Sequence, residues 1–166
     1  MLPQAVLEEL VNGDFSGARR RAAWRRAARW LRGAPTSDRL LSFEQARHAL
    51  GEIEEIYHGR RSVPVEKISG TVGRQRDFDR TFLPVRGDLS ERWKQADRIL
   101  HRLEELAPVR LYKIGDAYFV SEGHFRVSVA HYHGLRYVGA EVTEVRALKD
   151  ARVGADAGPA IPTGTF

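Results

Sequence analysis

The second half of the chain carries a series of turn and helix signals that strongly constrains the order of its strands and helices. Two short β-branched and aromatic segments flank Gly115-Asp116, a dipeptide typical of a hairpin turn. Gly123 then opens a helical pattern that Gly134 should end, and an alternating segment follows. We expect strands over residues 109–114, 117–120 and 138–145, and a helix over residues 123–133. This order predicts a small α/β (α+β) domain with a mixed sheet.

The middle of the chain adds one strand, one long loop and one helix. Residues 63–68 alternate and are β-branched, which predicts a strand with Pro64 near its start. Residues 90–106 form a helical pattern whose core face should include Trp93. The loop over residues 69–88 is too long to be idle in a compact domain, so it should either be functional or cover something.

The N-terminal part reads as a helical extension. We expect a first helix over residues 3–12, which Asn12-Gly13 ends, and a second from Asp14 or Ser16 to Arg32, which Gly33 ends. A third helix over residues 43–50 should have Ser42 as its cap. Residues 51–62 should be a transition, because their charge flips from acidic to basic. We therefore divide the chain into an arginine-rich extension (1–58), an α/β domain (59–148) and a flexible tail (149–166).

Composition narrows the class of protein. The 166 residues include no cysteine, which excludes a disulfide framework, a thiolate nucleophile and a cysteine-bound metal. The first residues carry acid where a signal peptide carries base, and no apolar run approaches membrane-spanning length, so we expect a cytoplasmic protein. A net charge of +5 and a pI near 9.9 favour a nucleotide, nucleic acid or other polyanion as partner.

The corner where residue 123 opens a helix is a candidate phosphate site. The first turn of a helix has unpaired backbone N–H groups at the positive end of the dipole. Gly123 allows close approach of the backbone, and His124 and Arg126 add side-chain donors. The alternative is an ordinary strand–turn–helix corner in which Arg126 pairs with a carboxylate such as Glu122.

The same residues resemble a known family. The segment Gly-His-Phe-Arg-Val-Ser-Val-Ala from Gly123 is similar to the Gly-x-x-Arg-x-x-x-Ala segment of ParB-type domains. It also resembles Gly-Cys-His-Arg of sulfiredoxins and Gly-x-His-Arg of free-serine kinases. The strand over residues 63–68 and the segment Arg74-Gln75-Arg76 resemble the family's first strand and its Gln-Pro-Arg segment, although the proline is missing. The similarity covers about half of the chain.

The resemblance implies a ParB/sulfiredoxin-like fold and a nucleotide site. It implies a regulatory module that holds the phosphates of CTP, ATP or ADP with Mg²⁺ and that is DNA-associated, as in chromosome partitioning. The phosphate-binding residues would be Gly123, His124, Phe125, Arg126, Arg74 and Arg76. His124 stands where sulfiredoxins have their nucleophilic cysteine, so sulfiredoxin chemistry is excluded. We expect that a partition protein's helix-turn-helix and C-terminal dimerisation domains are missing here.

Evidence for an enzyme is weaker than evidence for a binding module. The free-serine kinases of this family suggest a small-molecule kinase or an NTPase, for which Asp77 and Asp79 in the long loop could supply metal or base. A solvated, capping role for these acids is the favoured interpretation. His131 and His133 lie two apart on a helix and point to different sides. With no nearby acid in the sequence, we predict packing or surface histidines and no metal site.

The arginine-rich helix supports a second hypothesis, a nucleic-acid-binding accessory protein. Residues 14–33 contain seven arginines and one acidic residue. The apolar side, which we expect to dock on the α/β domain, consists of Ala23, Trp24, Ala27, Ala28, Trp30 and Leu31. The basic side consists of Arg19, Arg21, Arg25, Arg26, Arg29 and Arg32. It suits a nucleic-acid backbone or a membrane surface, unless Glu52, Glu54 and Glu55 neutralise it. The sequence is also compatible with a homodimer.

Overall fold

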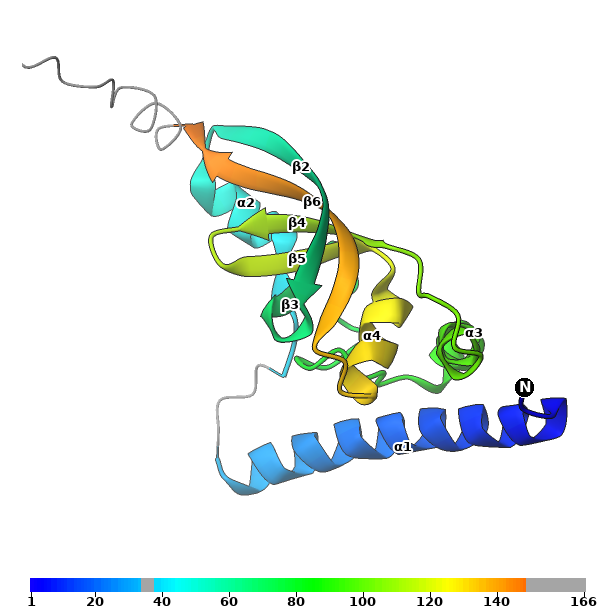
Figure 1. The fold of residues 1–166 in the computed structure, drawn as a ribbon. Helices are drawn as coiled ribbons and strands as arrows, with labels where there is room; N and C mark the ends of the chain where they lie inside the picture. Colours follow the sequence, from blue (N-terminus) through cyan, green and yellow to red (C-terminus); the bar gives the residue numbers. More distant parts are fainter. Residues whose placement is uncertain (34–37, 149–166) are drawn as a thin grey trace, which may run out of the picture.

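A six-stranded mixed sheet lies at the centre of the fold (Figure 1). The computed structural model describes residues 1–33 and 38–148. The helices are α1 (Gln4–Leu31), α2 (Phe43–Leu50), α3 (Ser90–His101) and α4 (His124–Tyr132), with short 3-10 turns η1 (Val65–Lys67) and η2 (Gly87–Leu89). The strands are β1 (Leu41–Ser42), β2 (Ile53–Pro64), β3 (Ile68–Thr71), β4 (Val109–Ile114), β5 (Ala117–Glu122) and β6 (Tyr137–Ala147).

The sheet confirms the predicted α/β class with a mixed sheet. Its strand order is β1-β3-β5-β4-β6-β2. Strands β4 and β5 form the predicted antiparallel hairpin, and Gly115 between them takes a positive φ of 57°. The pairs β1–β3, β3–β5 and β4–β6 are parallel, and β6 pairs with β2 antiparallel. Parallel neighbours need a crossover connection, and the chain passes from β4 to its parallel neighbour β6 through β5 and α4.

Local sequence signals explain where several elements begin and end. The Ser42 hydroxyl accepts a hydrogen bond from the Gln45 backbone N–H at 3.3 Å, which confirms the predicted cap of α2. Helix α4 follows Gly123, whose φ of 96° is left-handed, and Gly134 beyond its end has a φ of 68°. These two glycines confirm the predicted bounds of this helix to within one residue.

Helices and the long loop cover both faces of the sheet. On one face, Val127 and Ala130 of α4 pack with Phe78 and Phe82 of the loop over the central strands. On the other face, Phe43 of α2 packs against aromatic side chains of β4 and β5. The loop therefore covers the core, which is the second of the two roles predicted for it.

Helix α1 departs from the prediction of two shorter helices. It runs unbroken for 28 residues through Gly13, although a glycine inside a helix costs about 1 kcal/mol relative to alanine. The compensation is burial of a continuous face against α3 and α4, which consists of Leu7, Val11, Phe15, Ala18 and Ala22. Trp93 of α3 lies fully buried beneath this face, and its ring centroid is 5.7 Å from that of Phe15.

Other predicted boundaries were wrong. Residues 51–62 are no transition, because most of them belong to β2, which pairs along its length with β6. The strand predicted over residues 63–68 is split between the end of β2, η1 and the start of β3. Helix α3 ends at His101 instead of continuing to residue 106, and Leu103 beyond it has a positive φ of 59°.

The structure does not test two of the predicted divisions of the chain. The division between residues 58 and 59 stays a prediction, and β2 runs across that position. The tail predicted over residues 149–166 lies outside the described residues. Among the helices that the structure describes, none combines the length and apolar character needed to cross a membrane.

Candidate functional site

A pocket opens at the corner where the sequence predicts a phosphate site. It has a volume of about 520 Å³ and lies between α3, the end of β5 and the first turn of α4. Its lining residues are Val72, Arg74, Arg92, Gln95, Ala96, Ile99, Ser121, Glu122, Gly123, His124, Phe125 and Arg126. The predicted residues 123–126 and Arg74 are therefore brought together, and α3 contributes a wall that the sequence interpretation did not include.

The backbone at Gly123 gives the pocket its shape. A Cβ atom at this position would lie 2.7 Å from Val109 Cγ1 and 3.0 Å from Arg126 Nη2. With the positive φ, these contacts make glycine the residue that fits here. No side chain caps the N-terminus of α4, and no acidic residue lies in its first turn. Within the described residues, the positive end of this helix dipole therefore has neither a side-chain cap nor a first-turn carboxylate beside it.

Arg126 has a structural task as well as a place in the pocket wall. Its Nη1 donates hydrogen bonds of 2.8 Å to the backbone oxygens of both Ala107 and Pro108. These bonds tie the first turn of α4 to the segment that leads into β4. The alternative pairing of Arg126 with Glu122 is not the arrangement observed, because Glu122 lies 3.3 Å from Arg110.

Two further arginines approach the pocket from other elements. The Arg74 guanidinium lies 5.0 Å from the centroid of the Phe125 ring and pairs with Asp77 at 2.8 Å, which fixes its position. Arg92 of α3 is exposed and, within the described residues, has no hydrogen bond or ion pair. Arg92 was not among the residues predicted from the sequence, although its spacing from Gln95 and Ile99 places the three on one face of a helix.

His124 is a buried packing residue. Its side chain is 5% exposed, and its Nε2 lies 2.6 Å from Thr71 Oγ1. Burial, with a smaller contribution from the nearby Arg74 charge, lowers the pKa of His124 to about 4. At neutral pH the imidazole is therefore uncharged and engaged with Thr71. In this arrangement the side chain is therefore not free to donate to a phosphate, contrary to the expectation from the sequence.

The loop acids and Arg76 lie away from the lining of the pocket. Arg76 is exposed and is not a lining residue. Asp77 pairs with Arg74 and, at 3.3 Å, with Arg86. Asp79 is buried, and its Oδ1 accepts hydrogen bonds from the Thr81 and Leu83 backbone N–H groups. Both carboxylates thus hold the loop together, which is a structural role, although they are not the solvated helix caps that the favoured interpretation predicts.

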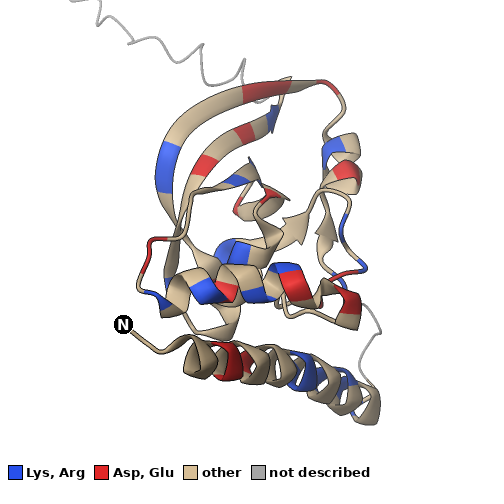
Figure 2. Cartoon of the chain, turned by 90° about the vertical axis from the view of Figure 1, so that its right-hand side faces the viewer, with Lys and Arg blue, Asp and Glu red and all other residues tan. Residues whose placement is uncertain are grey.

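Helix α1 is oriented differently from the prediction. The side expected to dock is largely exposed, with Trp24 at 74% and Trp30 at 79% relative exposure. The predicted docking was wrong because the smaller residues Ala18 and Ala22 allow closer packing on α3 and α4. In Figure 2 the basic positions of α1 gather in the half away from its N-terminus. Of these arginines, Arg21 donates to the Tyr132 backbone oxygen at 3.2 Å.

The other arginines of the predicted basic side of α1 differ in their surroundings. Arg29 lies 3.7 Å from Asp38. The exposed arginines of the predicted basic side are Arg19, Arg25, Arg26 and Arg32, with Arg21 also exposed at its backbone contact. The start of β2, which carries Glu54 and Glu55, lies at the opposite end of the molecule from α1 (Figure 1). Neutralisation of the helix by these glutamates is therefore not supported.

The two histidines near the end of α4 point to different sides, as predicted. His131 is stacked on Phe82, with ring centroids 5.7 Å apart, and burial lowers its pKa to about 4. His133 instead lies 2.7 Å from Asp97 of α3. Two acids, Asp14 and Asp97, do lie beside His133 in space, and they come from helices that are distant in the sequence.

Comparison with known proteins adds a distant structural similarity. No protein-family model matches the chain, and no curated protein matches it. Among solved structures, the chain is similar to sulfiredoxin from Arabidopsis thaliana, with 17% sequence identity and a TM-score of 0.36. That similarity covers 50% of this chain and 82% of the other protein. A similarity of this degree carries no argument about what the chain binds.

Proposed function

We propose that the pocket at the N-terminus of α4 binds the phosphate groups of a nucleotide, and that the protein is a nucleotide-binding module. The observation that carries the proposal is the convergence of three arginines on one uncapped helix N-terminus: Arg74 from the loop, Arg92 from α3 and Arg126 from α4. Planar guanidinium groups and backbone N–H groups are the donors that phosphate oxygens accept best.

The size and polarity of the pocket support a small-molecule ligand. Its volume of about 520 Å³ lies within the range of about 300–1,000 Å³ that is usual for ligand pockets. Val72, Ala96 and Ile99 offer an apolar wall beside the arginines, which suits a base or ribose next to a phosphate chain. The kinase alternative receives no such support, because Asp77 and Asp79 do not line the pocket.

The proposal is tested by thermal unfolding of the full chain with CTP, ATP, ADP or inorganic triphosphate, each with and without Mg²⁺. A ligand at 100 times its Kd stabilises the folded state by about 2.7 kcal/mol, so at least one nucleotide should raise the melting temperature. Arg92→Ala should abolish the shift without loss of stability, because Arg92 is exposed. Arg47→Ala, at an exposed position of α2, is the matched control and should keep the shift.

Two results would contradict the proposal. One is that none of these ligands changes the melting temperature of the wild-type protein. The other is that Arg92→Ala and Arg47→Ala keep the same shift, which would place the ligand elsewhere. A shift with inorganic triphosphate and none with the nucleotides would reduce the site to one for phosphate chains alone.

A second candidate function, binding of single-stranded nucleic acid, is favoured by the exposed aromatic residues of α1. Trp24 and Trp30 lie uncovered on the same half of the helix as Arg25 and Arg26. Exposed aromatic rings on which bases stack, placed among basic side chains, are the usual components of a single-strand surface. This surface and the pocket are independent features, so either function can hold without the other.

A further inference from the structure

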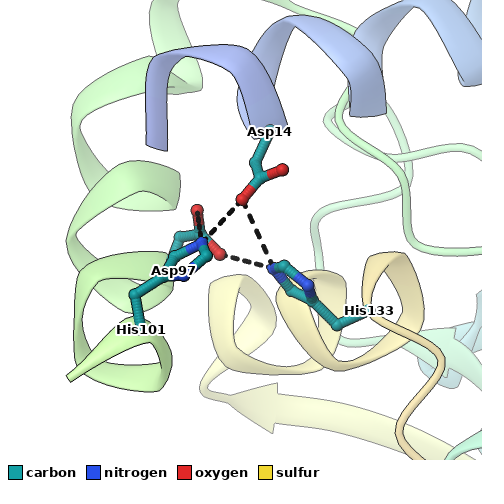
Figure 3. Close-up of side chains that lie close together, drawn as sticks. All are labelled: Asp14, Asp97, His101 and His133. Carbon is teal, nitrogen blue, oxygen red and sulfur yellow. Dashed lines mark hydrogen bonds and ion pairs between the residues drawn. The ribbon is translucent and has the colours of Figure 1, made fainter. Parts of the chain in front are cut away.

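Four metal-ligating side chains meet where α1, α3 and the end of α4 come together (Figure 3). Asp14 comes from α1, Asp97 and His101 from successive turns of α3, and His133 directly follows α4. Each offers one ligand atom, and these atoms all lie within 4.8 Å of one another. None of the four lines the pocket described above.

The distances among these side chains, which involve both oxygens of Asp97, lie on either side of the ligand spacing in a tetrahedral metal site. His101 Nε2 lies 2.7 Å from Asp14 Oδ2 and 3.6 Å from Asp97 Oδ2. His133 Nε2 lies 2.7 Å from Asp97 Oδ1 and 3.9 Å from Asp14 Oδ2. Zn²⁺ with bonds of about 2.0–2.1 Å holds its ligand atoms about 3.3 Å apart. The two short contacts need to lengthen by only about 0.6 Å when an ion replaces the shared protons.

Burial and charge give a second reason to expect a cation. The Asp97 side chain is 0% exposed, and its Oδ2 has no hydrogen-bond partner within the described residues. A buried carboxylate oxygen without a partner is costly. With both carboxylates ionised and both imidazoles neutral, the four side chains together carry two negative charges, which a divalent cation balances.

We propose that Asp14, Asp97, His101 and His133 bind one Zn²⁺ ion that joins α1 to α3 and α4. Imidazole nitrogen with carboxylate oxygen suits Zn²⁺, whereas Ca²⁺ and Mg²⁺ take mainly oxygen ligands. Four protein ligands fill a tetrahedral coordination sphere, so the ion has a structural role. The Tyr132 hydroxyl lies 3.4 Å from Asp14 Oδ1, on the far side of that carboxylate, and helps to orient it.

The competing explanation is a set of hydrogen-bonded ion pairs that holds the helices together without metal. Burial raises the pKa of Asp97, and the hydrogen bond that His133 donates to the Asp97 carboxylate raises the pKa of His133, so the cluster also has an affinity for protons. Both explanations predict that removing a side chain from the cluster destabilises the protein. They differ in whether stability depends on added metal, and the experiment is designed around that difference.

The test uses the full chain, treated with a chelator, dialysed, and titrated with Zn²⁺ alone at pH 7.5. We expect one tight site by calorimetry and a rise in melting temperature on adding Zn²⁺, with no rise on adding Ca²⁺ or Mg²⁺. Asp14→Asn and His101→Gln keep shape and polarity, and each should weaken Zn²⁺ binding at least about tenfold. His48→Gln, at an exposed position of α2, is the matched control and should leave the affinity unchanged.

Co²⁺ provides a readout that a purely structural role does not affect. The wild-type protein with Co²⁺ should show the visible absorption of a four-coordinate ion, and His133→Gln should lose it. The proposal is overturned if the wild-type protein binds Zn²⁺ no more tightly than His101→Gln, or if the Zn²⁺-dependent stabilisation persists in Asp14→Asn and His101→Gln. Circular dichroism of each metal-free variant establishes that a lost signal does not come from an unfolded chain.

Discussion

Among single residues, His124 has a direct consequence for the dependence of stability on pH. The imidazole is buried beneath the first turn of α4, and its pKa falls from the ordinary 6.5 to about 4. Between these values the unfolded chain binds a proton that the folded chain does not. The free energy of unfolding therefore falls as the pH is lowered from 6.5 towards 4, and this contribution is fully present above pH 6.5.

The first residue-scale prediction is that His124→Gln flattens this pH dependence. The wild-type protein should lose about 1.4 kcal/mol of stability from this group for each pH unit below 6.5. Glutamine can keep a hydrogen bond to Thr71 but does not titrate, so the variant should lose less. Urea unfolding at pH 7.5, 6 and 5 measures the difference, with His48→Gln as the control. Parallel curves for wild type and His124→Gln would show that His124 is not the responsible group.

The residues of the pocket show what sequence can reveal at this scale. Gly123 and Arg126 were identified because a glycine before a helix and a basic side chain in its first turn are local signals. The partners of Arg126 are backbone oxygens of residues 107 and 108, and no local pattern indicates them. Arg92 was missed for the same reason, since only packing of α3 beside α4 brings it to the pocket.

Among the elements, α1 allows a direct test of which of its faces packs against the rest of the protein. Phe15 lies on its buried face against Trp93, whereas Trp24 is exposed. Phe15→Ala should reduce the free energy of unfolding by about 3–5 kcal/mol, and Trp24→Ala should change it by less than about 0.5 kcal/mol. Chemical denaturation of both variants provides the measurement. A large loss for Trp24→Ala would mean that the side of the helix first expected to dock does so after all.

Elements with strong local signals were predicted well, and those that depend on distant partners were not. The β4–β5 hairpin, α2 and α4 have turn or cap residues in the sequence and occur where expected. Strand β2 was missed because its residues are only partly buried and its hydrogen-bond partner β6 lies far along the chain. Helix α1 was predicted as two helices divided at Gly13. The burial that offsets the cost of this glycine depends on packing against α3 and α4, which the local sequence does not indicate.

At the scale of the whole molecule, the uneven distribution of charge gives the test of the second candidate function. Binding of a labelled single-stranded oligonucleotide should weaken steeply as salt is raised, because neutralised phosphates release counterions. The double variant Arg25→Glu/Arg26→Glu should weaken binding strongly. Arg60→Glu/Arg61→Glu changes the same charge on exposed residues of β2 and should weaken it less. Equal losses in the two variants would assign the binding to net charge and not to α1.

The edge of the sheet has a consequence for how the protein behaves at high concentration. Strand β2 is the last in the strand order, so its outer backbone groups have no neighbouring strand within the described residues. A long bare edge is a template on which another molecule can add a strand and start an aggregate. Here the register shifts between Tyr57 and Gly59, and Arg60 and Arg61 follow at once. The irregularity and the two adjacent positive charges interrupt this template within the strand, so they should hinder the addition of a second molecule.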